Sequence, residues 1–141
     1  MTLKKLRADS NGTAVIEFAM AMPVLITIMI GILQFALVLQ ASGAMRHGMG
    51  EGLRYAKVNA ISDPSDAVAV AALKAKVEEI AKDSMAGIDR DHITSMEFTS
   101  GTSDGADYGQ LDVKYQMQPL IPFAPLPPIT INESRTVFLP S

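Results

Sequence analysis

A continuous apolar run from Phe18 to Leu39 constrains this chain more than any other feature. Its sequence is FAMAMPVLITIMIGILQFALVL, which has no charged residue and only two polar ones, Thr27 and Gln34. As a helix rising about 1.5 Å per residue, the run extends roughly 33 Å, enough to cross the roughly 30 Å hydrocarbon core of a bilayer. The run therefore predicts a transmembrane helix. The alternative is a buried core helix, which a domain within a chain of 141 residues could hardly surround.

The charges that flank the run predict its orientation. Lys4, Lys5 and Arg7 precede it within a short leader that is opposed only by Asp9. Short basic segments stay on the cytoplasmic side of a membrane. We therefore expect a cytoplasmic N-terminus, with everything after about residue 42 across the membrane, which in a bacterium is the periplasmic side of the inner membrane.

A cleaved signal peptide and an uncleaved anchor are the two alternative interpretations of this N-terminal region. The stretch QASGA, residues 40–44, places small residues for a cut after Ala44. The apolar run is, however, much longer than the usual 7–15 residues of a signal peptide, and it contains Pro23. Both alternatives stay open at this point.

Composition argues against several functional classes. The net charge is −3 and there is no cysteine, so the chain has neither a basic field for nucleic acid nor a thiolate for catalysis or metal binding. His47 and His92 are isolated, and the Asp104–Asp107 loop lacks the spacing of an EF-hand. We expect no enzyme activity, no catalytic residue, no metal site and no cofactor.

The segment NGTAVIEFAMAMP, residues 11–23, contains a short pattern ahead of and at the start of the apolar run. Counted from a cut after Gly12, Thr13 is the first residue, Glu17 the fifth and Phe18 the sixth. With the basic leader, this pattern resembles the processing site of the Flp/Tad branch of type IV pilins. The apolar run and GEGLRYAKV, residues 50–58, are similar to the corresponding segments of TadE-like minor pilins, or pseudopilins. Gly50 departs from the family pattern, in which arginine is common.

The resemblance implies a role in pilus assembly. A prepilin peptidase would cut after Gly12, and the mature chain would meet other minor pilins, the major pilin and the inner-membrane assembly platform. As a minor pilin it would help to initiate or cap a Tad/Flp pilus and could be incorporated into the extracellular filament. The alternative function is a bitopic anchor whose periplasmic head binds something unrelated to pili.

Glu17 is chemically unusual at the edge of an apolar run. A cut after Gly12 creates an α-amine on Thr13, one helical turn before this carboxylate. Within one chain such a pair contributes only a few tenths of a kcal/mol, whereas an unpaired acid in lipid is costly. We therefore expect Glu17 to pair with the Thr13 amine of a neighbouring subunit. An interfacial, snorkelling Glu17 is the alternative.

Two further positions shape the expected transmembrane helix. Pro23 removes one helical hydrogen bond and predicts a kink near residues 19–23. Gly31 allows a close approach between helices, although these residues could simply face lipid.

The rest of the chain predicts an α+β head. The expected parts are a leader over 1–12, a transmembrane helix over 13–42, an amphipathic helical extension over 43–60, and a small head over 61–141. The extension places Met45, Met49, Leu53 and Ala56 on one stripe. Glycines at 43, 48, 50 and 52 predict that this extension is a marginal helix, prone to bend or melt.

The expected head is one helix on a three-stranded antiparallel sheet. The helix should begin near Asp63 as its cap, with Pro64 in its first position, and end near Ala86 at Gly87. Strands are expected over 92–100, 111–117 and about 128–139, with GTSDGADYG, residues 101–109, as the loop between the first two. The stretch Asn132–Arg135 breaks the alternation and suggests a bulge.

The segment PLIPFAPLPP, residues 119–128, has five prolines in ten residues and no charge. Such a sequence favours an extended, polyproline-like conformation. It either packs on its own head as a crossover or forms an exposed contact ridge for another pilin or the membrane surface. The residues of that ridge would be Leu120, Ile121, Phe123 and Leu126.

Overall fold

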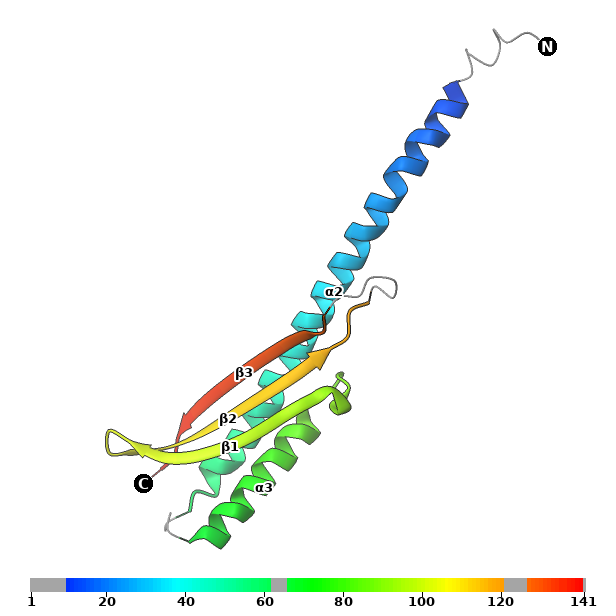
Figure 1. Ribbon diagram of the computed structural model, residues 1–141. Helices are drawn as coiled ribbons and strands as arrows, with labels where there is room; N and C mark the ends of the chain where they lie inside the picture. The colour runs from blue at the N-terminus through cyan, green and yellow to red at the C-terminus, as the bar shows by residue number, and fades with distance from the viewer. Residues whose placement is uncertain (1–9, 62–65, 121–126, 141) are drawn as a thin grey trace, which may run out of the picture. The chain divides into compact units, whose positions relative to one another are not determined.

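The computed structural model describes residues 10–61, 66–120 and 127–140, which form two helices, a short 3-10 helix and one sheet. The chain divides into two compact units, Met1–Ala36 and Leu37–Ser141. Helix α2, Ser10–Val58, contributes to both. The α+β fold class is confirmed: a long apolar N-terminal helix is followed by a second helix and a three-stranded antiparallel sheet (Figure 1).

The sheet of the second unit is a meander in the order β1-β2-β3. Strand β1 spans Ile93–Ser103, β2 spans Ala106–Met117 and β3 spans Ile129–Phe138. All three predicted strands are present. The expected loop over 101–109 is wrong, because β1 and β2 continue to a tight turn in which only Asp104 and Gly105 lie between the paired Ser103 and Ala106.

Backbone geometry explains that short turn. Asp104 and Gly105 have φ values of 52° and 78°. A two-residue hairpin turn with both φ values positive matches the right-handed twist of the strands, and Asp-Gly is a favoured pair for it. The composition of residues 101–109 resembles a loop, but most of its small residues lie within paired strands.

Helix α3, Ala67–Ser84, begins later than the sequence suggests. Its N-cap is Asp66, whose carboxylate accepts hydrogen bonds from the backbone amides of Val68 and Ala69 at 3.0 and 3.1 Å. The expected cap at Asp63 is therefore wrong, and Asp63 and Pro64 lie outside the described residues. At the other end the helix is capped at Met85, two residues before Gly87, which has φ +80°.

Both helices of the second unit pack on one face of the sheet (Figure 1). Their buried side chains meet Phe98 of β1 and alternate residues of β2 in one core. The stripe predicted for the helical extension is confirmed, because Met45, Met49, Leu53 and Ala56 are all buried. The buried residues are Ala41, Met45, Met49, Leu53, Ala56, Leu73, Val77, Ala81, Met85, Phe98, Leu111, Val113 and Tyr115.

Glycines 48 and 52 bring α2 and α3 into close contact. A Cβ atom on Gly48 would lie 2.4 Å from the carbonyl oxygen of Ala81, and one on Gly52 would lie 2.8 Å from that of Val77. The expectation of a helix that bends or melts here is wrong, since α2 runs through all four glycines to Val58. Packing against α3 and the sheet offsets the low helical propensity of glycine.

Candidate assembly site

The predicted processing residues lie at the beginning of α2, in the first unit. Gly12, Thr13, Glu17 and Phe18 are helical and exposed. A Cβ atom on Gly12 would have no neighbour within 4 Å. Thr13 and Glu17 are separated by four positions and therefore face the same side of the helix. The structure thus places the prospective amine-bearing residue and the carboxylate one turn apart.

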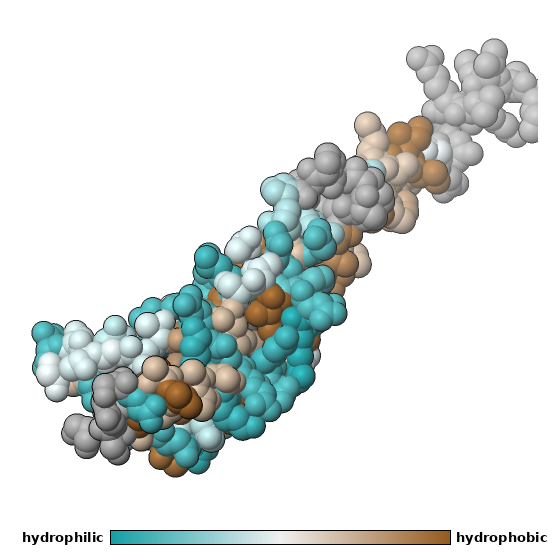
Figure 2. All heavy atoms as spheres, turned by 60° about the horizontal axis from the view of Figure 1, so that its bottom comes forward, coloured by the Kyte–Doolittle hydropathy of each residue, from teal (hydrophilic) through white to brown (hydrophobic). Residues whose placement is uncertain are grey.

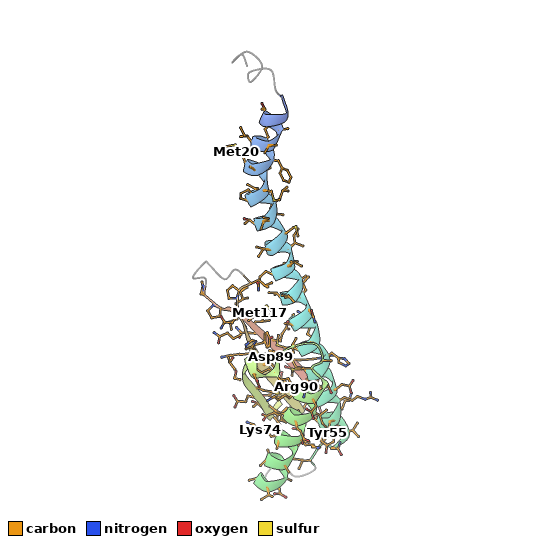
Figure 3. All side chains as sticks on the ribbon, turned by 90° about the vertical axis from the view of Figure 1, so that its right-hand side faces the viewer. Met20, Tyr55, Lys74, Asp89, Arg90 and Met117 are labelled. Carbon is orange, nitrogen blue, oxygen red and sulfur yellow. The ribbon has the colours of Figure 1, made fainter. Side chains whose placement is uncertain are left out.

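The apolar run that follows is almost entirely exposed. Side chains project outward around the helix near Met20 (Figure 3), and the visible surface of this segment is hydrophobic, whereas hydrophilic residues dominate the visible surface of the second unit (Figure 2). The helix is long and apolar enough to cross a membrane, and none of its apolar window is buried. Because exposed apolar surface on this scale is unfavourable in water, this segment is a single-pass membrane anchor.

Pro23 lies inside α2, which remains helical on both sides of it. The hydroxyl of Thr27 donates a 2.8 Å hydrogen bond to the Pro23 carbonyl oxygen, so this polar side chain is satisfied within its own helix. A Cβ atom on Gly31 would have no neighbour within 4 Å. The surface at Gly31 is thus open to a neighbouring helix or to lipid.

In the second unit, a polar cluster fastens α2 to the edge strand β3. Glu133 of β3 accepts a hydrogen bond from the hydroxyl of Ser42, and its two carboxylate oxygens each lie 3.1 Å from Nε of Arg46. The Glu133 side chain is only 15% exposed, against 69% for that of Arg46. Glu133 is thus a nearly buried acid held by two donors from one helix.

The electrostatics of Glu133 follow from these contacts. Burial raises the pKa of the Glu133 carboxyl, but the hydrogen bonds from Arg46 and Ser42 and the charge of Arg46 outweigh it, so the pKa lies below its ordinary value. Glu133 is therefore ionised at neutral pH and stabilises the contact between α2 and β3 in that form.

Arg135 of β3 occupies the space beside Gly50. Its Nη1 donates a 3.3 Å hydrogen bond to the carbonyl oxygen of Arg46 and would lie 3.0 Å from a Cβ atom on Gly50. The guanidinium group of Arg135 thus occupies the space that the absent side chain of Gly50 leaves open.

The stretch QASGA, residues 40–44, is integral to the second unit. Nε2 of Gln40 donates a 2.9 Å hydrogen bond to the carbonyl oxygen of Gly87, and Ala41 is fully buried in the core. A cut after Ala44 would remove Gln40, Ala41 and Ser42 from these contacts. The geometry therefore disfavours the signal-peptide alternative.

The other predicted contact residues are placed only in part. Leu120 is described and is 46% exposed. Ile121, Phe123 and Leu126 lie outside the described residues. The expected bulge over Asn132–Arg135 is wrong, because β2 and β3 pair without a register shift. The irregularity in the sheet lies instead between Ile93 and Ser95 of β1.

Within residues 10–61, 66–120 and 127–140, no cluster of three or more His, Asp or Glu side chains could hold a metal ion. A small cavity of about 170 Å³ lies beside α3 and the β1–β2 hairpin. It is lined by Ala60, Ile61, Val70, Leu73, Ser100, Gly101, Thr102, Asp107, Tyr108, Leu139 and Pro140.

Sequence reasoning missed the cluster of Ser42, Arg46, Glu133 and Arg135. A signal was present, because Glu133 and Arg135 occupy positions of β3 at which alternation requires inward-facing side chains. Two charges facing inward on a strand call for partners from another element. The sequence does not indicate that α2 is that element.

An exposed apolar helix joined to a small αβ unit defines a membrane-anchored protein with a folded domain outside the bilayer. Residues 12–54 match the model of a family described as TadE-like protein, which confirms the resemblance over that segment. The match begins at Gly12 and ends within the part of α2 that packs in the second unit. Comparisons with curated proteins and with solved structures gave no match.

Proposed function

We propose that this chain is a minor pilin that is processed after Gly12 and helps to initiate or cap a Tad/Flp pilus. The observation that carries the proposal is the TadE-like match, which begins at Gly12, in the first turn of an exposed apolar helix. In this proposal residues 1–12 are the leader and the helix from residue 13 spans the membrane. Its expected end at residue 42 moves to before Gln40, because Gln40, Ala41 and Ser42 make contacts within the second unit. Residues 43–60 form the helical extension and 61–141 complete the head. The protein acts as a structural subunit without enzymatic activity.

In this proposal Glu17 links processing to assembly, because it binds the amine that processing creates. A carboxylate at the centre of a bilayer costs about 2.5–3.5 kcal/mol in insertion measurements and less near the interface. Processing creates an α-amine on Thr13, which is charged at neutral pH. When subunits pack side by side with an axial shift, the amine of one subunit meets Glu17 of the next and offsets this cost.

The expected partners follow from the same segment. The prepilin peptidase acts on Gly12 and Thr13, while Phe18, Pro23 and Gly31 shape the surface that packs on other minor pilins and the major pilin. The inner-membrane assembly platform and the lipid bilayer are the remaining proposed partners. The head lies in the periplasm, and its Pro-rich segment, with Leu120, Ile121, Phe123 and Leu126, forms a further pilin contact.

Substitution of Glu17 tests this mechanism. We expect Glu17→Ala to be inserted and processed like the unaltered chain but to fail in co-purification with the other pilins. Glu51→Ala, on the same helix but in the second unit, is the matched control. Normal processing together with normal assembly of Glu17→Ala would show that the pairing role is wrong.

A further inference from the structure

The outward face of α2 in the second unit carries a row of cations. Arg46, Arg54 and Lys57 each follow a buried residue by one position, about 100° around the helix. Gly50 lies in the same row, after buried Met49, and the guanidinium group of Arg135 fills its place. The resulting cationic row of Arg46, Arg135, Arg54 and Lys57 is exposed along its length.

A hollow opens within this row. It has a volume of about 310 Å³ and is lined by Arg46, Met49, Glu133, Ser134 and Arg135. Glu133 neutralises Arg46 in part, but Arg54 and Lys57 have no salt bridge among the described residues. The hollow and the two exposed cations beyond it fit carboxylates from another molecule.

The remainder of the same unit has the opposite charge. Residues 59–141 contain twice as many acidic as basic side chains. Most exposed carboxylates on α3 already pair with lysine or arginine, as in the 3.0 Å pair of Lys76 and Glu79. Asp104 and Asp112, on the β1–β2 hairpin, have no salt bridge in the described part of the chain.

We propose that the cationic row docks on the β1–β2 hairpin of a second copy of this chain. The contact joins two different surfaces, so a dimer still has one free cationic row and one free hairpin, and the contact can propagate. Its basis is charge complementarity between the helix and the hairpin of a single sequence. It adds a contact between the folded units of neighbouring copies to the proposed assembly function and rests on that function.

Because the chain has no cysteine, single-cysteine variants can test the contact in membranes. His47→Cys places a thiol on the exposed face of α2, and Ser103→Cys places one beside the hairpin turn. Full-length chains carrying one or the other are mixed in phosphatidylcholine vesicles and treated with a short bifunctional maleimide. We expect a crosslinked heterodimer, which Ala71→Cys on the exposed face of α3 does not form with Ser103→Cys.

Charge variants then test the chemistry of the contact. Arg54→Glu with Lys57→Glu should abolish the crosslink, as should Asp104→Asn with Asp112→Asn, because Asn tolerates the positive φ of Asp104. Lys76→Glu with Lys82→Glu on α3, an equal change of charge, should leave it intact. Raising the salt from about 0.01 M to about 1 M, which shortens the screening length from about 30 Å to about 3 Å, should also weaken the crosslink.

Several outcomes would overturn the proposal. One is a crosslink that survives Arg54→Glu with Lys57→Glu in a chain whose thermal unfolding is unchanged. Another is the absence of a crosslink above that of the Ala71→Cys pair. A third is protection of the thiol in the His47→Cys variant only in vesicles of anionic lipid, which would assign the row to lipid. The N-terminal residue of each chain is determined in parallel, so a failure of processing is distinguished from a failure of this contact.

Discussion

Gly52 of α2 and Ala81 of α3 lie in direct contact, such that a Cβ atom on Gly52 would lie 2.9 Å from the Cβ atom of Ala81. Together with Gly48, which faces the Ala81 carbonyl and Met85, this contact sets how closely the two helices approach. The half of α2 that follows residue 37 is therefore a core element of the folded unit as well as the continuation of the anchor.

The first prediction concerns these glycines. Gly48→Ala and Gly52→Ala should each lower the free energy of unfolding by about 1–3 kcal/mol, because an added methyl group forces packed backbones apart. The matched control is Gly43→Ala, where a Cβ atom has no neighbour within 4 Å. Since alanine is the better helix former, Gly43→Ala should raise stability by up to about 1 kcal/mol. Thermal or denaturant unfolding measures both effects, and equal results at positions 43 and 52 would contradict the packing.

The second prediction concerns how the free energy of unfolding changes at acid pH. A carboxyl whose pKa is lower in the folded than in the unfolded state stabilises the fold above the unfolded value, which is about 4.3 for glutamate. That stability should be lost as the pH falls from there through the lowered pKa of Glu133. Glu133→Gln should therefore be less stable than the unaltered chain at neutral pH and show a smaller loss on acidification.

The measurement for Glu133 is denaturant unfolding at a series of pH values. A hydrogen bond to a charged group contributes about 1.5–3 kcal/mol, which sets the expected loss at neutral pH. Glu97→Gln serves as the control, because Glu97 forms an exposed 3.7 Å pair with Lys74 and should change little. Parallel pH profiles for Glu133→Gln and the unaltered chain would show that this cluster does not contribute.

The third prediction concerns the free edge of β1. Oε1 of Glu78 on α3 accepts a 2.9 Å hydrogen bond from the backbone amide of Phe98. Because unpaired edge amides promote pairing with other chains, Glu78→Ala should speed hydrogen exchange at Phe98 and increase self-association. Glu79→Ala, which removes only a surface pair with Lys76, should do neither, and identical exchange in the two variants would refute this role of Glu78.

Local sequence signals predicted much of the fold. The apolar run, the stripe through Met45 and Met49, and the alternation in Leu111–Met117 each depend on one element, and each is confirmed. The sequence predictions were wrong where the local structure depends on contacts with elements distant in the chain. Most of residues 101–109 belong to strands β1 and β2, because the two strands pair up to the turn at Asp104 and Gly105. The glycines at 48 and 52 of α2 are tolerated because α3 packs on them.

The candidate assembly site likewise contains residues that the sequence predicts and residues that only the fold brings together. Gly12, Thr13 and Glu17 could be selected from sequence because the roles proposed for them depend on spacing along one segment. The cluster around Glu133 could not, since Ser42 and Arg46 lie about ninety positions earlier in the chain. Only the folded arrangement shows that the inward charges of β3 face α2 rather than forming a bulge.

Processing after Gly12 is tested by the N-terminal residue of the mature protein. The full-length chain is expressed with the Tad prepilin peptidase, recovered from membranes and analysed by intact mass and N-terminal sequencing. We expect Thr13 as the first residue, and an uncut chain when the peptidase is omitted. An intact Met1 in the presence of active peptidase, or a start at Met45, would contradict this processing.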